Sequence, residues 1–335
     1  MKKIFIVTGA NGFLGNNIIR KIVINSENEV RALVLPNDKI NALENLNCKI
    51  FYGDVTKKET LADIFKVQQN IPVYVIHCAA IVYIKNRKNS KVYDVNVNGT
   101  KNIIDKVLEI DAKLIYVNSV HAIWEKPNHE VMTEIDDFDP KKVKGLYAKT
   151  KAECAKYVLE MTKTKNLNAC IVHPSGIIGP YDFGRSHLTQ LLIDFCNKRL
   201  TACVRGGYDF VDVRDVADGI INACTMGKKG DCYILSNHYF SIKELLDMVS
   251  EVRNIKKIKT ILPLWFAKLT APLSEAYYSL LKQPPLYTSY SLYTLTSNSN
   301  FSNEKAKKEL NFKNTKFKQT IKDTIKWLEE HKLIK

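Results

Sequence analysis

The sequence predicts an α/β protein with a doubly wound parallel sheet and a smaller, mostly C-terminal α/β lobe. Short β-branched runs alternate with segments of helical spacing as far as Pro174, a pattern typical of parallel sheets covered by crossover helices. The first apolar run, residues 3–7, leads directly into a glycine-rich turn and a helix. After Pro174 the alternation loosens, which indicates a second lobe of different construction.

The composition is that of a globular chain with ample core. The chain has 335 residues, of which 45% are apolar, enough for one large domain or two. Its eight cysteines form no CxxC pair and mostly lie in apolar runs, so we expect buried free thiols, no disulfide and no metal site. The first apolar run is too short for a signal peptide, and we expect a cytoplasmic location.

The net charge of +15 is carried mainly by lysine, with 42 lysines against 8 arginines. The lysines are scattered over predicted helix surfaces, and no arginine cluster interleaved with aromatic residues occurs. We therefore expect no nucleic-acid partner, whereas a generally basic surface favours a phosphorylated small molecule.

Glycines at every third position, Gly9, Gly12 and Gly15, mark the turn after the first strand. Glycine permits positive φ and close backbone approach, and the following helix offers unpaired N–H groups and the positive end of its dipole. Such a turn binds pyrophosphate, and its place after an apolar strand fits a Rossmann-type dinucleotide site. The alternative is an ordinary strand-to-helix turn. The cofactor-binding residues expected here are Gly9, Asn11, Gly12, Phe13, Leu14 and Gly15.

The second strand, expected over residues 28–35, decides which dinucleotide is bound. An acid at its end would bond the ribose hydroxyls of NAD, whereas a nearby cation would accept the 2′-phosphate of NADP. No acid stands at the strand end, Arg31 lies within the strand, and Lys39 lies four residues beyond Leu35. We expect NADP or NAD, with NADP slightly favoured, and we include Arg31 in the cofactor site.

The third and fourth strands are expected over residues 48–52 and 72–80, with a polar helical stretch from Asp38 before the third. Asp54 follows the third strand and can accept from the adenine amino group or cap the helix that starts near Lys57. The fourth strand ends in small residues that leave room for a cofactor across its carboxyl end. Those residues are Cys78, Ala79 and Ala80.

Polar residues suited to chemistry occur in the next elements. A crossover helix is expected over residues 92–110, where Asn96 is polar among apolar neighbours and needs an internal partner. Ser119 ends the fifth strand, at the edge that faces ligand in open α/β sheets. Tyr147 and Lys151 lie one turn apart on the next helix, so they share one face and can reach the same cofactor.

Two lobes are expected to share one compact body. Residues 1–173 form the dinucleotide-binding domain, with returning segments near 208–236, and residues 174–207 and 237–335 form the substrate lobe. Short strands are expected over 203–204, 208–213 and 232–235, the last as an added edge of the main sheet.

The end of the chain is helical in pattern. Ser241 and Glu244 form a capping-box pattern for a helix over 240–253. Residues 262–281 are the most apolar stretch, but they contain Lys268, Glu275 and two prolines. We expect an amphipathic lid over an apolar substrate and no stable membrane insertion, with partial burial in a bilayer surface as the alternative.

Motifs spread over most of the chain resemble those of the extended short-chain dehydrogenase/reductases, the NAD-dependent epimerase/dehydratase group. Within that group the chain is most similar to dihydroflavonol-reductase-like and 3β-hydroxysteroid-dehydrogenase-like members. The motifs are much less specific for a substrate than for the superfamily. They are Thr8-Gly9-x-x-Gly12-x-x-Gly15, Gly53-Asp54-Val55, His77-Cys78-Ala79-Ala80, Asn96-Val97-Asn98-Gly99-Thr100, Ser119, Tyr147-x-x-x-Lys151, His173-Pro174-Ser175-Gly176-Ile177-Ile178-Gly179-Pro180 and Phe210-Val211-Asp212-Val213-Arg214-Asp215-Val216-Ala217.

The resemblance implies a role for each of the polar residues. Tyr147 is the general acid/base that exchanges a proton with the substrate oxygen. Lys151 holds the nicotinamide ribose and, as a cation, lowers the pKa of Tyr147. Ser119 orients the carbonyl oxygen, and Asn96 supports a proton relay. The cofactor-binding motifs add Val55, Pro174 and Ser175.

Two positions depart from the family pattern. The family usually has Arg where this chain has His173, and often has two hydroxyl residues where this chain has Asn118-Ser119-Val120. A strand register shifted by one residue would put Val120 at the catalytic position. The substrate contacts expected are His121, Tyr147, Arg185 and His187, although Arg185 and His187 also suit an ordinary surface position.

We therefore expect an NAD(P)-dependent oxidoreductase that transfers hydride between nicotinamide and a ketone or aldehyde, or the matching alcohol. One alternative is a nucleotide-sugar epimerase or dehydratase with tightly held NAD. Another is a dinucleotide-sensing regulatory protein, but such proteins usually lack the Tyr or the Lys, and this chain has both. Relatives often dimerise through the helix that carries Tyr147, which implies a homodimer.

Overall fold

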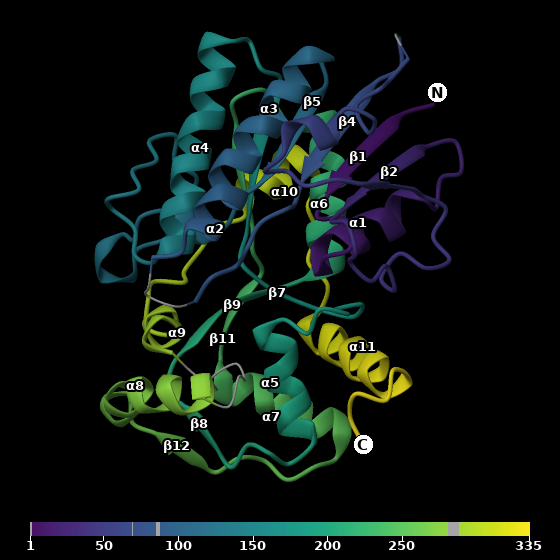
Figure 1. The fold of residues 1–335 in the computed structure, drawn as a ribbon. Helices are drawn as coiled ribbons and strands as arrows, with labels where there is room; N and C mark the ends of the chain where they lie inside the picture. Colours follow the sequence, from purple (N-terminus) through teal and green to yellow (C-terminus); the bar gives the residue numbers. More distant parts are fainter. Residues whose placement is uncertain (1, 69, 85–87, 281–287) are drawn as a thin grey trace.

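The computed structural model describes residues 2–68, 70–84, 88–280 and 288–335 and has two parts, one above the other in Figure 1. The upper part contains the N-terminus and a large sheet with helices on both faces, and the lower part contains the C-terminus. This is the α/β class predicted from the sequence. No helix within the described ranges is both long and apolar enough to cross a membrane.

The main sheet has seven parallel strands in the order β10-β6-β5-β4-β1-β2-β3. The strand order reverses at β1, which pairs with β2 on one side and with β4 on the other. Ligands of open α/β sheets bind at such a switch point, beyond the carboxyl ends of the strands. The strands are β1 (Ile4–Thr8), β2 (Glu29–Val34), β3 (Lys49–Tyr52), β4 (Val73–His77), β5 (Lys113–Val117), β6 (Ala169–Pro174) and β10 (Cys232–Leu235).

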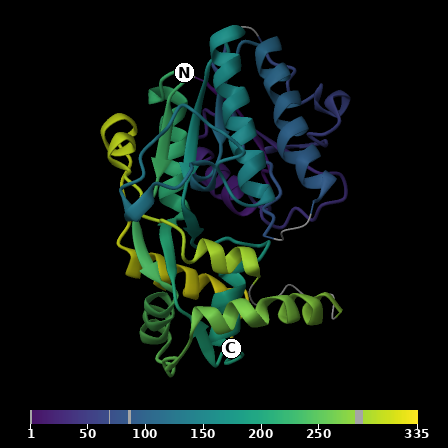
Figure 2. The ribbon, with the colours of Figure 1, turned by 90° about the vertical axis from the view of Figure 1, so that its left-hand side faces the viewer.

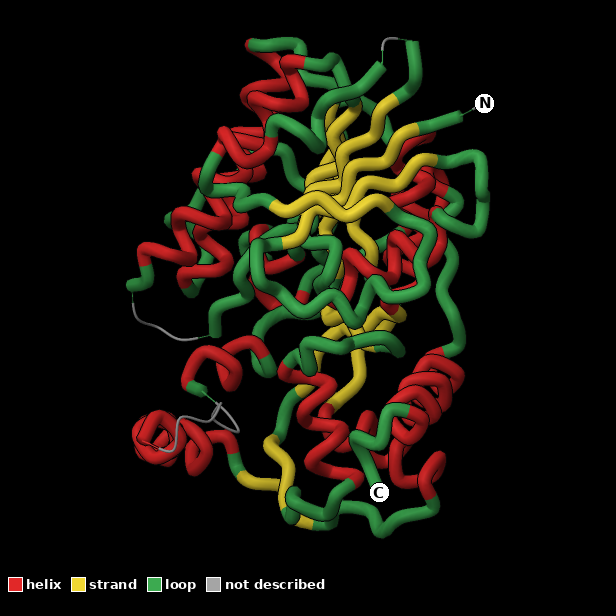
Figure 3. Tube along the Cα trace, turned by 45° about the vertical axis from the view of Figure 1, so that its right-hand side comes forward, coloured by secondary structure: helices red, strands yellow, loops and turns green. Residues whose placement is uncertain are grey.

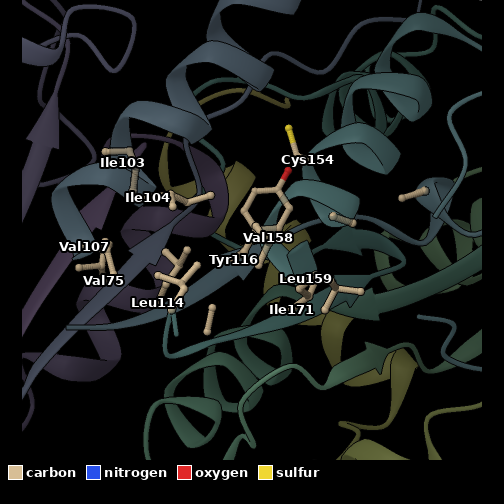
Figure 4. Close-up of a cluster of buried hydrophobic side chains, with 14 of the residues drawn as sticks. Val75, Ile103, Ile104, Val107, Leu114, Tyr116, Cys154, Val158, Leu159 and Ile171 are labelled. Atoms are coloured by element: carbon tan, nitrogen blue, oxygen red, sulfur yellow. The ribbon is translucent and has the colours of Figure 1, made fainter. Parts of the chain in front are cut away.

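Helices cover both faces of this sheet, and the apolar side chains between the layers form its core. On one face α1 (Phe13–Ile22) packs beside α6 (Val213–Met226). On the other lie α3 (Gly99–Glu109) and α4 (Leu146–Thr164). Tyr116 is only 1% exposed and lies among apolar side chains of these two helices, with its hydroxyl directed toward Cys154 (Figure 4).

The smaller part is built from short strands and helices. Its three-stranded sheet has the order β11-β9-β7, and β8 pairs with β12. Figure 3 shows these strands below the main sheet, with helices around them. The elements are β7 (Gly176–Ile178), α5 (His187–Cys196), β8 (Ala202–Val204), β9 (Gly207–Asp212), β11 (His238–Ser241), α7 (Ile242–Arg253), β12 (Thr260–Leu262), α8 (Leu264–Leu280), α9 (Ser289–Thr294), α10 (Glu304–Leu310) and α11 (Phe317–Glu330).

The returning segment of the dinucleotide-binding domain was expected to start near residue 208. In the structure it starts with α6, at Val213. β9 belongs to the small sheet, because it pairs with β7 and β11. α6 then packs on α1, and β10 pairs with β6 at the edge of the main sheet. The edge strand predicted over 232–235 is confirmed.

Local sequence signals for helices succeeded in one place and failed in another. The capping box is confirmed at the start of α7, where the side chains of Ser241 and Glu244 each accept from the other's backbone N–H. The helix expected from Asp38 is wrong, because that described segment forms turns. Asn37 and Asn45 have φ of 70° and 62° there, a left-handed conformation that ends helical bonding.

Candidate active site

The glycine turn brings three pieces of backbone into close contact. Gly9 has φ +62°, and a Cβ at this position would lie 2.8 Å from the Ala79 nitrogen at the end of β4. A Cβ at Gly15 would lie 2.2 Å from the Gly9 oxygen. Only glycine fits either position, so the first turn of α1 lies directly against the switch point.

The start of α1 is suited to a diphosphate. Gly12 is the N-cap and offers no side-chain cap, and the first turn contains no acidic residue. Its backbone N–H groups and the helix dipole are therefore available to an anion. Phe13 and Leu14 are half-buried on the same turn. The residues present thus fit the pyrophosphate of a dinucleotide, which Gly9 to Gly15 would hold.

Lys39 is brought beside this turn, because the Asn11 amide donates to the Lys39 carbonyl oxygen. The Lys39 side chain is exposed. Asp54 lies after β3 and accepts from Thr56 N at 2.9 Å and from Thr56 Oγ1 at 2.8 Å, all through Oδ1. The Val55 side chain packs against Gly99, where an added Cβ would lie 2.6 Å from Val55 Cγ2.

Arg31 does not join the cofactor residues. Its guanidinium donates to Glu29 Oε1 at 2.8 Å, to Ile64 O at 2.8 Å and to Lys66 O at 2.7 Å. These contacts use the side chain inside the protein, where Arg31 is 9% exposed. The expectation that Arg31 selects a phosphate is therefore corrected: it ties β2 to the segment after Leu61.

A buried chain of hydrogen bonds connects the glycine turn to the crossover helix. Ala79 N donates to Thr8 Oγ1 at 3.1 Å, and Thr8 Oγ1 lies 2.7 Å from His77 Nδ1. His77 Nε2 lies 3.0 Å from Thr100 Oγ1, which donates to Asn96 O at 2.5 Å. The last bond uses the Thr100 proton, so His77 is the Nε2–H tautomer and accepts at Nδ1. Burial lowers the pKa of His77 to about 3, which keeps it neutral.

Asn96 lies in a π-helical turn, Asp94–Asn98, between α2 (Ser90–Tyr93) and α3. Its Oδ1 accepts from Ile81 N at 2.8 Å, and its Nδ2 donates to Ile81 O at 3.1 Å and to Thr150 Oγ1 at 3.0 Å. Thr150 in turn donates to Tyr147 O at 2.8 Å. Asn96 thus finds the internal partners that its burial requires, and fixes α4 to the segment after β4.

Ser119, Tyr147 and Lys151 come together at the carboxyl end of β5. The Ser119 hydroxyl lies close enough to the Tyr147 phenol to lower its pKa, and it accepts from His121 N at 3.3 Å. Lys151 Nζ donates to Val117 O at 2.7 Å and lies 5.0 Å from the centre of the Tyr116 ring. Val120 instead packs in the apolar core, so the serine and not the valine faces Tyr147.

Burial controls the charges of these groups. It raises the pKa of Tyr147 to about 12, against the smaller lowering effect of the Ser119 hydrogen bond. It also lowers the pKa of Lys151 to about 8. The sequence predicted that the Lys151 ammonium would lower the pKa of Tyr147. The pKa of Tyr147 moves in the opposite direction, because the phenol is desolvated and the ammonium is bonded to Val117 O.

A cluster of aromatic rings lies beside the Tyr147 side chain. The ring of His121 lies 6.3 Å from that of Tyr147, edge to face, and stacks on Tyr208 at 5.4 Å. His121 Nε2 lies 3.1 Å from the Tyr208 hydroxyl, within hydrogen-bond distance. The Tyr290 ring lies 6.4 Å from His121. Burial lowers the pKa of His121 to about 4, so this ring is neutral.

His173 supports Ser119 from behind. Its Nδ1 donates to Ser119 O at 3.2 Å, and its ring stacks on Phe138 at 5.4 Å. Pro174 ends β6, and the Ser175 hydroxyl donates to Asp209 Oδ1 at 2.5 Å. Ser175 lies in a motif that was expected to bind the cofactor. Its hydroxyl also connects the end of the main sheet at β6 to β9 of the small sheet.

The other predicted substrate residues lie apart. Arg185 and His187 are exposed, and no contact among the described residues joins either one to Tyr147. Their loop is held by Asn16, whose amide donates to Tyr181 O at 3.0 Å, and by Phe183 against Trp327. Arg185 and His187 therefore lie at the surface, which was the alternative to a substrate contact.

Sequence reasoning missed four residues that shape the site: Thr8, Thr100, Tyr208 and Tyr290. Thr8 and Thr100 stand inside quoted motifs, and their hydroxyls in otherwise apolar or glycine-rich runs were a signal for buried hydrogen bonds. Tyr208 and Tyr290 come from the distant second lobe. No local pattern could have predicted that they would meet His121.

The switch-point turn and the Ser119, Tyr147 and Lys151 cluster are features of the α/β proteins that act as dinucleotide-dependent oxidoreductases or epimerases. The chain belongs to the NAD dependent epimerase/dehydratase family, whose model matches residues 5–236. It is therefore an extended short-chain dehydrogenase/reductase, an NAD(P)-dependent enzyme family.

Relatives match over the whole chain. Sterol demethylase protein B of Methylococcus capsulatus is 26% identical and covers 98% of this chain and 99% of its own length. A Synechocystis protein provisionally named dihydroflavonol 4-reductase is 27% identical, and the match covers 100% of this chain and 97% of that protein. The crystal structure of gox2253 has a TM-score of 0.85 at 29% identity, covering 99% of this chain and 100% of that one.

Replacing Gly12 by Ala should weaken dinucleotide binding without unfolding the protein. Gly12 is exposed with φ −75°, which Ala adopts, but the new Cβ would lie 3.0 Å from Gly9 O at the phosphate position. We expect the Kd for NADPH to rise about tenfold, roughly 1.4 kcal/mol, in a fluorescence titration. Gly184→Ala is the control, since its Cβ would meet only Asp182 Oδ1 at 3.7 Å. Equal weakening in both variants would contradict this prediction.

Replacing Arg31 by Met should reduce stability and leave cofactor affinity unchanged. The change leaves two buried carbonyl groups without their donor and removes one of the three cations that pair with Glu29. We expect a loss of about 3 kcal/mol of unfolding free energy in urea. Lys21→Met is the control, because its pair with Asp218 is exposed and contributes below about 1 kcal/mol. A fully stable Arg31→Met protein that binds NADPH poorly would restore the phosphate role.

Proposed function

We propose that the protein is a reductase that reduces an apolar, ring-containing ketone or aldehyde with a nicotinamide cofactor, or oxidises the matching alcohol. The observation that carries this proposal is the aromatic enclosure beside the Tyr147 phenol, in which His121 contacts Tyr147 while Tyr208 and Tyr290 pack against His121. Flat rings with no charged group among them favour an apolar substrate over a sugar.

A cavity next to these rings supports the same substrate class. It has a volume of about 170 Å³ and is lined by His121, Tyr208 and apolar side chains. Lys142, Lys144 and Glu125 also line it, and all three are exposed. An apolar substrate body with a polar end would fit this combination. The apolar lining is Val120, Ile123, Met132, Val143 and Phe301.

The chain's own residues account for the proton and for the orientation of the substrate. A bound nicotinamide supplies or accepts the hydride. With a pKa of about 12, Tyr147 keeps its proton at neutral pH and can donate it to the carbonyl oxygen. The Ser119 hydroxyl would hold that oxygen beside the phenol, and Lys151 would bind the nicotinamide ribose.

The alternative of a nucleotide-sugar epimerase or dehydratase needs cations for the sugar's diphosphate. Arg199 pairs with Asp194 at 3.3 Å, and Arg205 follows β8, where its backbone N–H bonds Leu262 O. Arg185 remains exposed on its loop. The relatives named for sterol and dihydroflavonol chemistry also favour polycyclic substrates over sugars.

For the cofactor we propose NADP, with Lys39 as the residue that contacts its 2′-phosphate. The support is the bond from Asn11 to the Lys39 carbonyl, which keeps this exposed lysine next to the diphosphate turn. Asp38 precedes it, so the local charge is mixed. We also retain the homodimer and the cytoplasmic location as proposals.

Replacing Tyr147 by Phe should lower kcat for carbonyl reduction roughly 100-fold or more, because the proton donor is lost. Steady-state NADPH oxidation on a panel of cyclic ketones measures this. NADPH binding by fluorescence should persist, which separates loss of chemistry from loss of fold. Unchanged turnover would remove Tyr147 from the mechanism. Interconversion of UDP-sugars without net NADPH oxidation would favour the epimerase.

The two reaction directions should differ in pH dependence. Reduction needs the protonated phenol, which persists below a pKa of about 12, so loss of the Tyr147 proton should not lower its rate between pH 6 and 9. Oxidation needs the phenolate, whose fraction rises about tenfold per pH unit in that range. Alcohol oxidation should therefore accelerate with pH. The same rise in Tyr147→Phe would assign it to another group.

Replacing Lys39 by Gln should raise the Kd for NADPH about tenfold and leave the Kd for NADH unchanged, since only NADPH has the 2′-phosphate. Lys313→Gln, an exposed lysine in the second half of the chain, is the control for the general loss of charge. An equal effect on both cofactors would exclude Lys39 as the selector.

A further inference from the structure

α8 packs with its small side chains and exposes its large ones. Ala267 and Ala271 are fully buried, in a cluster with Leu292 of α9 and Val204 of β8. Trp265, Leu269 and Leu273 are 68%, 68% and 72% exposed. A helix that serves only the protein core buries its large apolar residues. α8 does the opposite, because it buries small residues and exposes large apolar ones.

The three most exposed of these residues share one face of α8. Trp265, Leu269 and Leu273 are four residues apart and therefore lie on one face of the helix. Phe266, 39% exposed, follows Trp265 in the sequence, and Ile261 of β12, 44% exposed, lies four residues before Trp265. We call these five residues the α8 stripe. Figure 2 shows α8 at the lower edge of the molecule, extending away from the remainder of the lobe.

Positive charge surrounds the α8 stripe. Residues 254–273 contain four lysines and no acidic residue. Lys257 pairs with Glu251 at 3.2 Å, whereas Lys256, Lys259 and Lys268 are exposed and form no ion pair with any described residue. The surface thus combines a large aromatic ring, aliphatic side chains and unpaired cations.

We propose that the α8 stripe docks the protein on an anionic lipid surface. Apolar side chains of this kind enter the boundary between headgroups and acyl chains, and an indole ring prefers that depth. Lysines beside them are attracted by anionic headgroups. α8 would lie in the plane of the surface without crossing it.

A second copy of the chain suits this surface less well. In a two-fold dimer the same patch meets itself, so Lys256, Lys259 and Lys268 of both copies would be brought into one interface. No acidic residue in 254–273 is present to offset that repulsion. Charge complementarity therefore favours the lipid surface.

Sedimentation with vesicles tests the proposal on the full chain. We expect binding to vesicles of phosphatidylcholine with phosphatidylserine and weak binding to phosphatidylcholine alone. Combined Trp265→Ser and Leu269→Ser should reduce the partition constant by more than about tenfold. Combined Lys256→Gln, Lys259→Gln and Lys268→Gln should reduce it on the order of 100-fold at low salt, since each lysine contributes about fivefold.

Ile24→Ser is the matched control, because Ile24 is 80% exposed and lies after α1, in the other part of the molecule. It should leave vesicle binding unchanged. Failure of the parent chain to bind, or equal losses in Ile24→Ser and in the stripe variant, would overturn the proposal. So would a dimer in light scattering that the stripe variant dissociates, since a second copy would then cover the surface. Circular dichroism checks that each variant is folded.

Discussion

The close approach of the glycine turn to the end of β4 is the constraint on which the site depends. The Gly9 and Gly15 positions leave no space for a Cβ, so the first turn of α1 is held against Ala79. The hydrogen bonds from Ala79 through Thr8, His77 and Thr100 then fix the crossover helix relative to that turn. Through Asn96 and Thr150 the same contacts reach the helix that carries Tyr147. The glycine turn and Tyr147 are thus parts of one packed unit.

Burial, rather than neighbouring charge, sets the protonation states around the site. His77, His121 and His173 all have lowered pKa values because they are desolvated, and all are neutral at physiological pH. The same effect raises the pKa of Tyr147 and lowers that of Lys151. A lysine one helical turn from a tyrosine therefore does not by itself make the phenol acidic. Its ammonium must point at the oxygen, and here a backbone carbonyl holds it.

Local patterns in the sequence predicted the main sheet, its strand ends and the glycine turn, because each depends on residues close together in the chain. The cluster of Ser119, Tyr147 and Lys151 was predictable for the same reason, through strand ends and helical spacing. Arg31 could not be assigned correctly, since its partners are backbone carbonyls after Leu61. The aromatic enclosure was not predictable either, because Tyr208 and Tyr290 reach His121 only through the packing of the second lobe. The helix expected from Asp38 is missing because two asparagines, Asn37 and Asn45, adopt left-handed backbone conformations, and the spacing of apolar residues does not indicate such conformations.

The strand β10 has a consequence for how the molecule is assembled. It follows the small sheet's β9 in the chain, yet it forms the outer edge of the main sheet beside β6. A polypeptide cut after residue 173 would end without it, and would also lack α6 over the face that α1 shares. The backbone donors and acceptors of β6 would then be open to pairing with other chains. The main sheet and its helix layers are thus complete only once the chain has been synthesised through β10.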